Sequence, residues 1–328
     1  MRRRDFIIFL GGLTAILPDA TRAQPKEKIY RIGYLSAPTR ESVRRTLDSF
    51  LQKVRELGWI EGTNISIEYR WADGDIARLP QLAAELVQSN VDLIVAPATS
   101  AAVAAKNATS RIPIVMVFPV EPVELGLVSS LSRPGGNVTG TTFTAGAGFV
   151  GKLLETLKQA VPDISKVGVL GNSAEPSFNS QMGELDAAAA SLGIQLQRFN
   201  VSGPEQLDAM FSALAPQQID ALVLVTSSTL GPYRNRVAEL AIKGRLPMIA
   251  GLREFSEAGT LLSYGVNISN FVGRAAVYVD KIFRGAQPAD LAVEQPTKYE
   301  LIINLKTATA LGITISPLVL ARADEVIE

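Results

Sequence analysis

Small, hydroxyl and amide side chains stand directly after several short apolar runs of the sequence, at Ser36, at Ala98, Thr99 and Ser100, at Asn172 and Ser173, and at Thr226 and Ser227. A hydroxyl and free backbone N–H groups at the start of a helix suit a carboxylate, because the helix N-terminus carries a partial positive charge and unpaired donors. The pattern therefore predicts a site for a small anionic or zwitterionic solute. Helix capping alone also explains a hydroxyl at such a position, so that alternative stays open for each of them.

Two charged and two aromatic residues complete the candidate site. Glu121, in the loop after the apolar run 112–118, would receive an ammonium group, and Arg253 would pair with a carboxylate in bidentate fashion. Phe118 and Phe143 are candidate apolar walls. The alternative for each charged residue is an ordinary solvated surface position.

The residue types missing from the chain exclude much of catalytic chemistry. None of the 328 residues is a cysteine or a histidine, which removes thiol catalysis, the usual general base near neutral pH and the commonest metal ligands. No G-x-G-x-x-G sequence follows the first expected strand, and the phosphate-binding sequence G-x-x-x-x-G-K-[ST] is absent. We therefore expect no enzyme activity, no metal and no cofactor.

The composition is that of a folded globular protein with room for two domains. Hydrophobic residues make up 47% of the chain and charged residues 20%. The formal net charge is zero, and basic residues do not cluster beyond the first few positions. A nucleic-acid partner is therefore not expected.

Residues 1–23 have the organisation of an export signal. An arginine run at 2–4 precedes a mainly apolar run at 6–17, and Ala23 ends a plausible cleavage site. The apolar run is shorter than the roughly 20 residues that span a bilayer, which disfavours an uncleaved anchor. The arginines also resemble the twin-arginine form of such signals. We expect the mature chain to be free in the periplasm.

The rest of the sequence alternates short apolar runs with longer helical patterns, which predicts βαβ units and parallel sheets. Strands are expected at 29–35, 64–71, 91–96 and 112–118, with helices at 41–57, 76–87 and 99–106. Open α/β sheets bind ligands at the carboxyl ends of their strands, where the polar groups described above stand. The elements therefore place the candidate residues at one edge of the sheet.

A second set of similar elements follows residue 140. The stretches 31–35, 91–95 and 111–115 are echoed, in the same order and at nearly one spacing, by 166–170, 219–223 and 245–249. The preserved order predicts two lobes of the same α/β architecture. Chance similarity of generic strand edges is the alternative.

The end of the chain does not repeat this unit. A strand is expected at 260–265, a helix at 271–283, a strand at 300–303, and a helix at 305–311 that is stopped by Gly312. We expect these elements to cross back between the lobes. The first lobe would then comprise 24–141 with about 268–292, and the second 142–267 with about 293–328, with 134–140 in the hinge.

Several longer stretches resemble a known family: ELGWIEGTN at 56–64, PVEP at 119–122, RPGGNVTG at 133–140, QPT at 295–297 and INLKTA at 303–308. In these stretches the chain resembles substrate-binding proteins of ABC importers, in the group that resembles tryptophan- and tyrosine-binding proteins. The resemblance implies the fold of type I periplasmic binding proteins, with two Rossmann-like parallel-sheet lobes around a hinged cleft.

The same resemblance implies a function. A small carboxylate-bearing solute, an aromatic or other amino acid, would be held between the lobes of a monomer and delivered to a membrane permease with its ATPase. Glu121 stands where we expect relatives to carry Asp. Two alternatives share the architecture: an exported enzyme, disfavoured by the lack of His and Cys, and a periplasmic sensor subunit that presents its ligand to a receptor.

Overall fold

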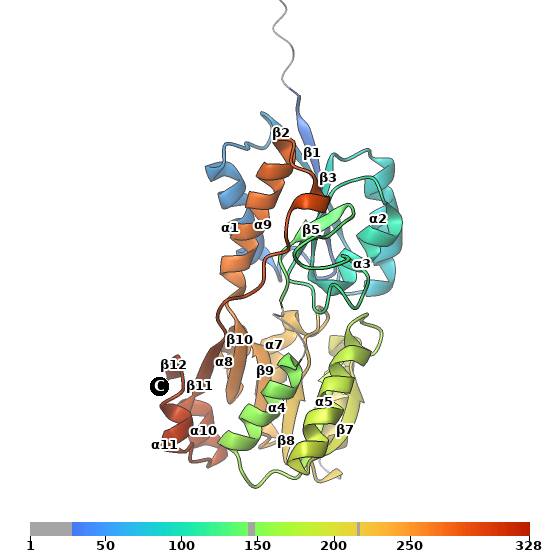
Figure 1. The fold of residues 1–328 in the computed structure, drawn as a ribbon. Helices are drawn as coiled ribbons and strands as arrows, with labels where there is room; N and C mark the ends of the chain where they lie inside the picture. Colours follow the sequence, from blue (N-terminus) through green and yellow to red (C-terminus); the bar gives the residue numbers. More distant parts are fainter. Residues whose placement is uncertain (1–27, 144–147, 215–216) are drawn as a thin grey trace, which may run out of the picture.

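The computed structural model describes residues 28–143, 148–214 and 217–328. In this part the chain forms two α/β lobes stacked end to end, each built on its own sheet (Figure 1). The predicted fold class, two parallel-sheet lobes, is therefore confirmed. The predicted export signal at 1–23 lies outside the described residues.

The first sheet has the strand order β2-β1-β3-β4-β5, and all its neighbouring strands are parallel. Its strands are β1 (Tyr30–Ser36), β2 (Ile65–Trp71), β3 (Leu93–Pro97), β4 (Ile114–Val117) and β5 (Val138–Gly140). Its helices are α1 (Arg44–Glu56), α2 (Leu79–Gln88), α3 (Ala98–Ala108) and, from much later in the chain, α9 (Ile268–Phe283). Helices α1 and α9 cover one face of the sheet, and α2 and α3 cover the other (Figure 1).

Residue spacing explains how these elements pack. The buried residues of α1 are Leu47, Phe50 and Val54, which recur at three- and four-residue spacing and so form one helix face. Strand β4 is buried at every position, because helices cover both faces of a parallel sheet. Gly58 follows α1 with φ of +92°, a left-handed conformation that favours glycine and ends the helix.

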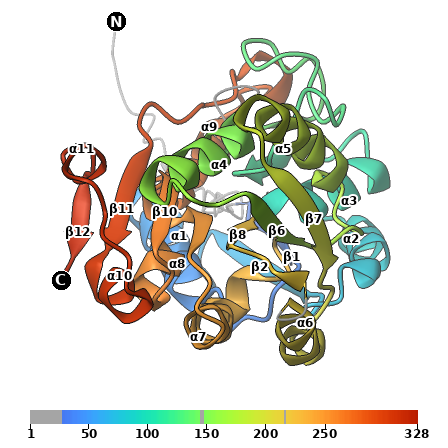
Figure 2. The same ribbon diagram turned by 90° about the horizontal axis from the view of Figure 1, so that it is seen from below.

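The second sheet has the strand order β12-β11-β10-β9-β8-β6-β7, in which only the β10–β11 pair is antiparallel among the described strand pairs. Its strands are β6 (Lys166–Gly171), β7 (Gln195–Asn200), β8 (Ala221–Leu224), β9 (Met248–Leu252), β10 (Leu262–Val266), β11 (Glu300–Asn304) and β12 (Glu325–Ile327). Its helices are α4 (Phe149–Ala160), α5 (Phe178–Leu192), α6 (Leu207–Leu214), α7 (Arg234–Lys243), α8 (Arg253–Ala258), α10 (Leu305–Leu311) and α11 (Pro317–Leu320), arranged around the sheet as Figure 2 shows.

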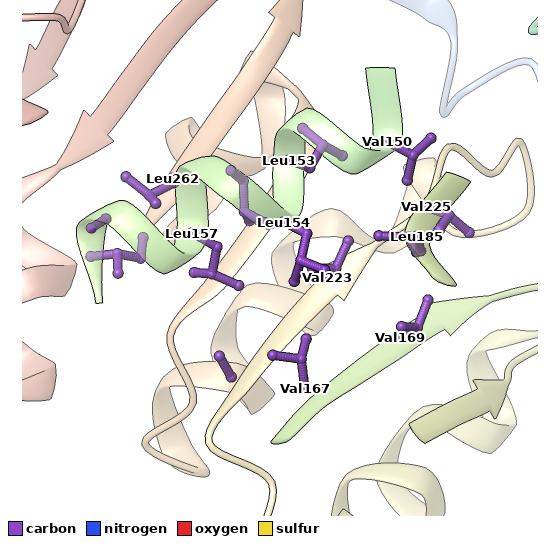
Figure 3. Close-up of a cluster of buried hydrophobic side chains, with 14 of the residues drawn as sticks. Val150, Leu153, Leu154, Leu157, Val167, Val169, Leu185, Val223, Val225 and Leu262 are labelled. Atoms are coloured by element: carbon purple, nitrogen blue, oxygen red, sulfur yellow. The ribbon is translucent and has the colours of Figure 1, made fainter. Parts of the chain in front are cut away.

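One core of this second lobe lies between the sheet and helices α4 and α5, and another lies on the opposite face, against α6 and α7. Leu153, Leu154 and Leu157 of α4 point toward the sheet, and Val167 and Val223 of the central strands point back at them (Figure 3). The leucines recur at helical spacing on one face of α4, so the helix buries a continuous apolar stripe.

The predicted repeat of one architecture is confirmed by strand order, because β2-β1-β3-β4 of the first sheet corresponds to β7-β6-β8-β9 of the second. The matched residues Asp92 and Asp220 also make the same contacts. Asp92 accepts a hydrogen bond from the Arg31 backbone N–H (2.8 Å), and Asp220 accepts one from the Lys166 backbone N–H (2.8 Å). Burial acts to raise the pKa of Asp220, but hydrogen bonds from Ser165 and Lys166 outweigh it and lower that pKa.

The chain passes between the lobes more than once, and two of the passages run side by side. The Glu294 N–H donates to the Gly140 carbonyl (2.9 Å), and the Thr142 N–H donates to the Glu294 carbonyl (2.9 Å). The expectation that all of 134–140 belongs to the hinge is wrong, because Val138–Gly140 pairs with β4 as strand β5. The lobe boundaries themselves stay a prediction.

Candidate ligand-binding site

A cavity of about 230 Å³ lies between the lobes, and both lobes line it. The first lobe contributes the ends of its strands β1, β3 and β4 through Ser36, Ala98 and Phe118. The second contributes Ser227, after β8, and Leu252, the last residue of β9. The cavity therefore lies at the carboxyl ends of parallel strands in both lobes, where the sequence predicts ligand binding.

A smaller cavity of about 50 Å³ adjoins the first and shares part of its lining. Its further walls are Thr99 of the first lobe, Phe143, which packs against the core of the second lobe, and Glu175 and Thr226 of the second lobe. The sequence-predicted residues that line one or both cavities are Ser36, Ala98, Thr99, Phe118, Phe143, Thr226 and Ser227. Their contact with a ligand stays a prediction.

Asn172 and Ser173 do not line either cavity. The Asn172 side chain donates to the Thr229 hydroxyl (3.0 Å) and accepts from the Ala174 N–H (3.0 Å). Ser173 is exposed, and its N–H donates to the side chain of Asn200 (2.7 Å). These residues shape the loop after β6, which is a structural role.

Glu121 and Arg253, the predicted charged contacts, lie outside the lining of both cavities. Glu121 is partly buried, with φ of +48° in the loop after β4. Arg253 pairs with Glu257 (2.9 Å), Glu325 (2.8 Å) and Glu300 (3.6 Å). These three carboxylates lie on α8, β11 and β12, so they balance the charge of Arg253 within the second lobe. The structure therefore does not favour Arg253 as a ligand contact.

The sequence reasoning missed Glu175, which is 6% exposed and connects the lobes. Its Oε1 accepts hydrogen bonds from the hydroxyls of Ser227 (2.8 Å) and Ser228 (3.1 Å) and from the N–H and hydroxyl of Thr229 (3.0 and 3.1 Å). Its Oε2 accepts from the hydroxyl of Ser100 in the first lobe (3.3 Å). The sequence could have indicated Glu175, because it is an acidic residue in the same strand-end loop as the candidates Asn172 and Ser173.

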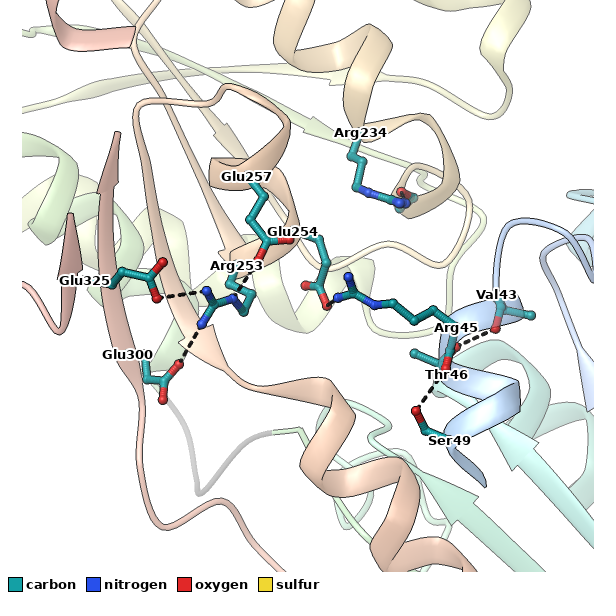
Figure 4. Close-up of polar contacts among 11 residues, drawn as sticks. Val43, Arg45, Thr46, Ser49, Arg234, Arg253, Glu254, Glu257, Glu300 and Glu325 are labelled. Atoms are coloured by element: carbon teal, nitrogen blue, oxygen red, sulfur yellow. Dashed lines mark hydrogen bonds and ion pairs between the residues drawn. The ribbon is translucent and has the colours of Figure 1, made fainter. Parts of the chain in front are cut away.

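Three further charged residues line the larger cavity, namely Arg45, Arg234 and Glu254. The guanidinium of Arg234 donates to the Gly231 carbonyl (3.4 Å), and no carboxylate of the described residues forms an ion pair with it. Arg45 of the first lobe lies 3.9 Å from Glu254 of the second. Figure 4 shows Arg45 and Glu254 turned toward each other, and Arg253 turned away toward Glu300 and Glu325.

The rest of the larger cavity is mostly apolar. Tyr34 and Phe50 line it from the first lobe, and Leu252 and Phe255 from the second. Burial, with a smaller contribution from Tyr69, raises the pKa of Tyr34, so this hydroxyl stays neutral. A mostly apolar cavity with charged groups in its lining suits an amphiphilic solute.

A profile of the family described as ABC transporter substrate binding protein matches residues 33–327. The chain belongs to this family. The family resemblance predicted from the sequence is therefore confirmed, and so is the role of a substrate-binding protein of an ABC transporter. Proteins of this family are typically extracytoplasmic, and their partners are a small-molecule ligand and an ABC permease.

Relatives of this substrate-binding protein include proteins that bind aromatic amino acids. A tyrosine-binding protein of Clostridioides difficile (strain R20291) is 29% identical over 285 residues, covering 87% of this chain and 81% of that protein. The crystal structure of an ABC domain from Streptococcus pneumoniae in complex with L-Trp is 25% identical and has a TM-score of 0.81, covering 91% of this chain and 99% of that one. The ligand-free, open structure of a substrate-binding protein with adhesive properties from Clostridium difficile is 26% identical, with a TM-score of 0.62 over 91% and 99% of the two chains.

Two kinds of feature are absent from the described part of this substrate-binding protein. No helix there is long and apolar enough to span a membrane. Within the same residues, no three acidic, histidine or cysteine side chains gather in a way that would hold a metal ion.

Proposed function

We propose that this substrate-binding protein holds a small carboxylate-bearing solute, an amino acid such as tyrosine or tryptophan, between its lobes and delivers it to a membrane permease and its ATPase. The observation that carries the proposal is a cavity lined by both lobes and by Arg234, whose guanidinium has no carboxylate partner among the described residues. In this role Arg234 replaces Arg253, whose charge is already paired.

Arg234 has the chemistry that a carboxylate needs. A guanidinium is planar and always charged, and its fork of donors matches the two oxygens of a carboxylate. Arg234 is partly buried at the start of α7, so a solute in the cavity would shield the charge pair from water. The hydroxyl of Ser36 offers a further donor on the first-lobe side of the cavity, whereas the Ser227 hydroxyl on the other side already donates to Glu175.

The arrangement of the lobes supports closure on a solute. Ser100 of the first lobe and Glu175 of the second meet at 3.3 Å, so the described structure has its lobes in contact. The overall similarity is also higher to the relative with bound L-Trp than to the open, ligand-free relative. A solute that contacts both lobes stabilises the closed state by its differential affinity for that state.

We also propose where this substrate-binding protein works and how it handles its solute. Residues 1–23 would direct export, by the twin-arginine route, and the mature monomer would work in the periplasm. It would bind and release its solute unchanged. The strand-end residues that line the cavities, including Thr99 and Thr226, would contribute hydroxyl contacts.

The proposal is tested by titrating residues 24–328 with L-tyrosine and L-tryptophan in a calorimeter and a thermal-shift assay. We expect a dissociation constant of micromolar order, about −8 kcal/mol, and stabilisation by about 2.7 kcal/mol at 100 times that concentration. Arg234→Gln should weaken binding at least about tenfold, since hydrogen bonds to charged groups contribute about 1.5–3 kcal/mol.

The matched control is Arg236→Gln in the same helix. Arg236 lies on the surface, pairs with Asp208 and Glu239, and does not line either cavity, so its loss should leave affinity unchanged. Failure to bind either amino acid, conversion of a bound compound into a product, or equal binding by the Arg234→Gln and Arg236→Gln variants would contradict the proposal.

A further inference from the structure

One carboxylate at the cavity lacks the contacts that a buried charge requires. Glu254 lines the larger cavity, and its side chain is 17% exposed. Its Oε2 is buried and has no hydrogen-bond partner among the described residues. Leaving a charged acceptor unsatisfied in this way is unfavourable, so the position calls for a donor that none of the described residues supplies.

The nearest cation does not fill this need. Arg45 lies 3.9 Å from Oε1 of Glu254, which is within ion-pair range but too long for a hydrogen bond. The Arg45 side chain is 72% exposed and reaches across the cleft from the other lobe. An ion pair of this kind is weak and is broken at little cost.

The other acidic candidates are less suited to accept a donor from a solute. Oε1 of Glu175 already accepts from Ser227, Ser228 and Thr229, and its Oε2 accepts from Ser100. Glu121 does not line either cavity. Glu254 therefore lines the larger cavity and keeps a buried acceptor without a partner, which rotation of its carboxylate group would turn toward a solute.

We infer that Glu254 receives an ammonium or other N–H-bearing group of the solute, and that Arg45 is its partner across the cleft in the absence of solute. The inference rests on the proposed function, since it assigns a residue to the solute's cationic group. Local structure supports it, because Leu252 ends β9 and α8 starts at once, so that Glu254 points toward Arg45 of the first lobe while Arg253 points toward Glu300 and Glu325 (Figure 4).

If Glu254 has this role, the protein selects solutes that carry an amine. A solute with an amine next to its apolar body gains a charge-assisted hydrogen bond to Glu254, whereas the same body without the amine leaves the buried oxygen unpaired. Glu254 would thus determine specificity, and Arg45 would move away toward solvent when the amine arrives.

The test compares amines with matched compounds that lack the amine. L-tyrosine is set against 3-(4-hydroxyphenyl)propanoate, and L-tryptophan against indole-3-propanoate, by calorimetry on the wild type and the variants Glu254→Gln, Glu257→Gln and Arg45→Ala. We expect the wild type to prefer the amine at least about tenfold, and Glu254→Gln to lose that preference while it still binds the amine-free compounds.

Two controls separate this role from a structural one. Glu257 lies in the same helix, pairs with Arg253 and does not line either cavity, so Glu257→Gln should keep the preference. Arg45→Ala removes the ion pair across the lobes but leaves Glu254, so it should keep the preference too. If the pair merely held the lobes together, Arg45→Ala and Glu254→Gln would weaken all four compounds by the same factor, which would overturn the inference.

The remaining outcomes distinguish the inference from the proposed function. If Glu254→Gln keeps the wild-type preference for amines, the inference is overturned and the proposed function stands. If the wild type binds neither amino acid, the proposed function fails and the inference fails with it.

Discussion

At the residue scale, Glu175 joins the lobes through hydroxyl groups in place of a basic partner. Its carboxylate is buried and accepts hydrogen bonds from Ser227, Ser228 and Thr229 of its own lobe and from Ser100 of the other. Hydrogen bonds to a charged acceptor are stronger than neutral ones, so this cluster fixes the loop after β8 where it meets both cavities.

We expect Glu175→Gln to lower the free energy of unfolding by about 1–3 kcal/mol. The NH2 group of the glutamine amide would replace a carboxylate oxygen and would face groups that donate hydrogen bonds to that oxygen in the wild type. The melting temperature should fall by several degrees. The control is Glu155→Gln, since Glu155 is a surface residue that pairs with Lys152. Equal melting temperatures for the two variants would show that the Glu175 cluster adds nothing to stability.

Sequence reasoning found part of the site and missed its charged end for a physical reason. Thr99, Thr226 and Ser227 were predictable because they follow strands, and strand ends define the cleft. Arg253 and Glu254 are adjacent in sequence, but successive residues of a helix point about 100° apart. Which of the two faces the cavity depends on how α8 is oriented, and no local pattern contains that information.

At the element scale, strands β9 and β10 approach so closely at the cleft that a glycine is needed. A Cβ on Gly265 would lie 1.7 Å from the Gly251 carbonyl oxygen, and the β9–β10 register shifts between Ser263 and Val266. The neighbouring residues Leu252 and Ile268 line both cavities. The close approach therefore positions one wall of the site.

Gly265→Ala should destabilise the protein by several kcal/mol or prevent folding, because the obstructing atom belongs to the backbone and must move with its strand. Gly273→Ala is the matched control. A Cβ on Gly273 meets nothing within 4 Å in helix α9, and alanine there should stabilise by up to about 1 kcal/mol. Urea unfolding of both variants measures the difference, and a Gly265→Ala variant as stable as the wild type would contradict the account of this wall.

Most long elements were predictable, and the shortest ones were not. The expected helix 305–311 with its stop at Gly312 is α10, because an apolar stripe and a left-handed glycine are local signals. Strands β5 and β12 have three residues each. Such strands form because a neighbouring strand offers free backbone groups, and that partner is set by the tertiary fold.

At the scale of the whole molecule, a repeat in the sequence predicted the two-lobe architecture. The matched stretches became β1, β3 and β4 in one sheet and β6, β8 and β9 in the other, in corresponding positions. Strand β11 and the edge strand β12 break the correspondence, since they extend only the second sheet. Both sheets point the carboxyl ends of these strands at the same cleft, which is the central feature of the proposed function.

Binding between the lobes requires that the solute enter and leave only when the lobes separate. Ser100 and Ser228 allow a direct test, because their hydroxyl oxygens lie 3.4 Å apart across the lobes and the chain has no cysteine. Cysteines at these two positions would place their sulfur atoms close together, so Ser100→Cys with Ser228→Cys is designed to join the lobes by a disulfide. Each single variant and the reduced double variant are the controls.

The decisive measurement is retention of radiolabelled L-tryptophan or L-tyrosine by the double variant, loaded while reduced, then oxidised and passed through a desalting column. The account predicts that the label stays with the oxidised protein and is released by reductant, and that protein oxidised before loading takes up none. Exchange of label at the same rate in the oxidised and reduced forms would contradict binding between the lobes.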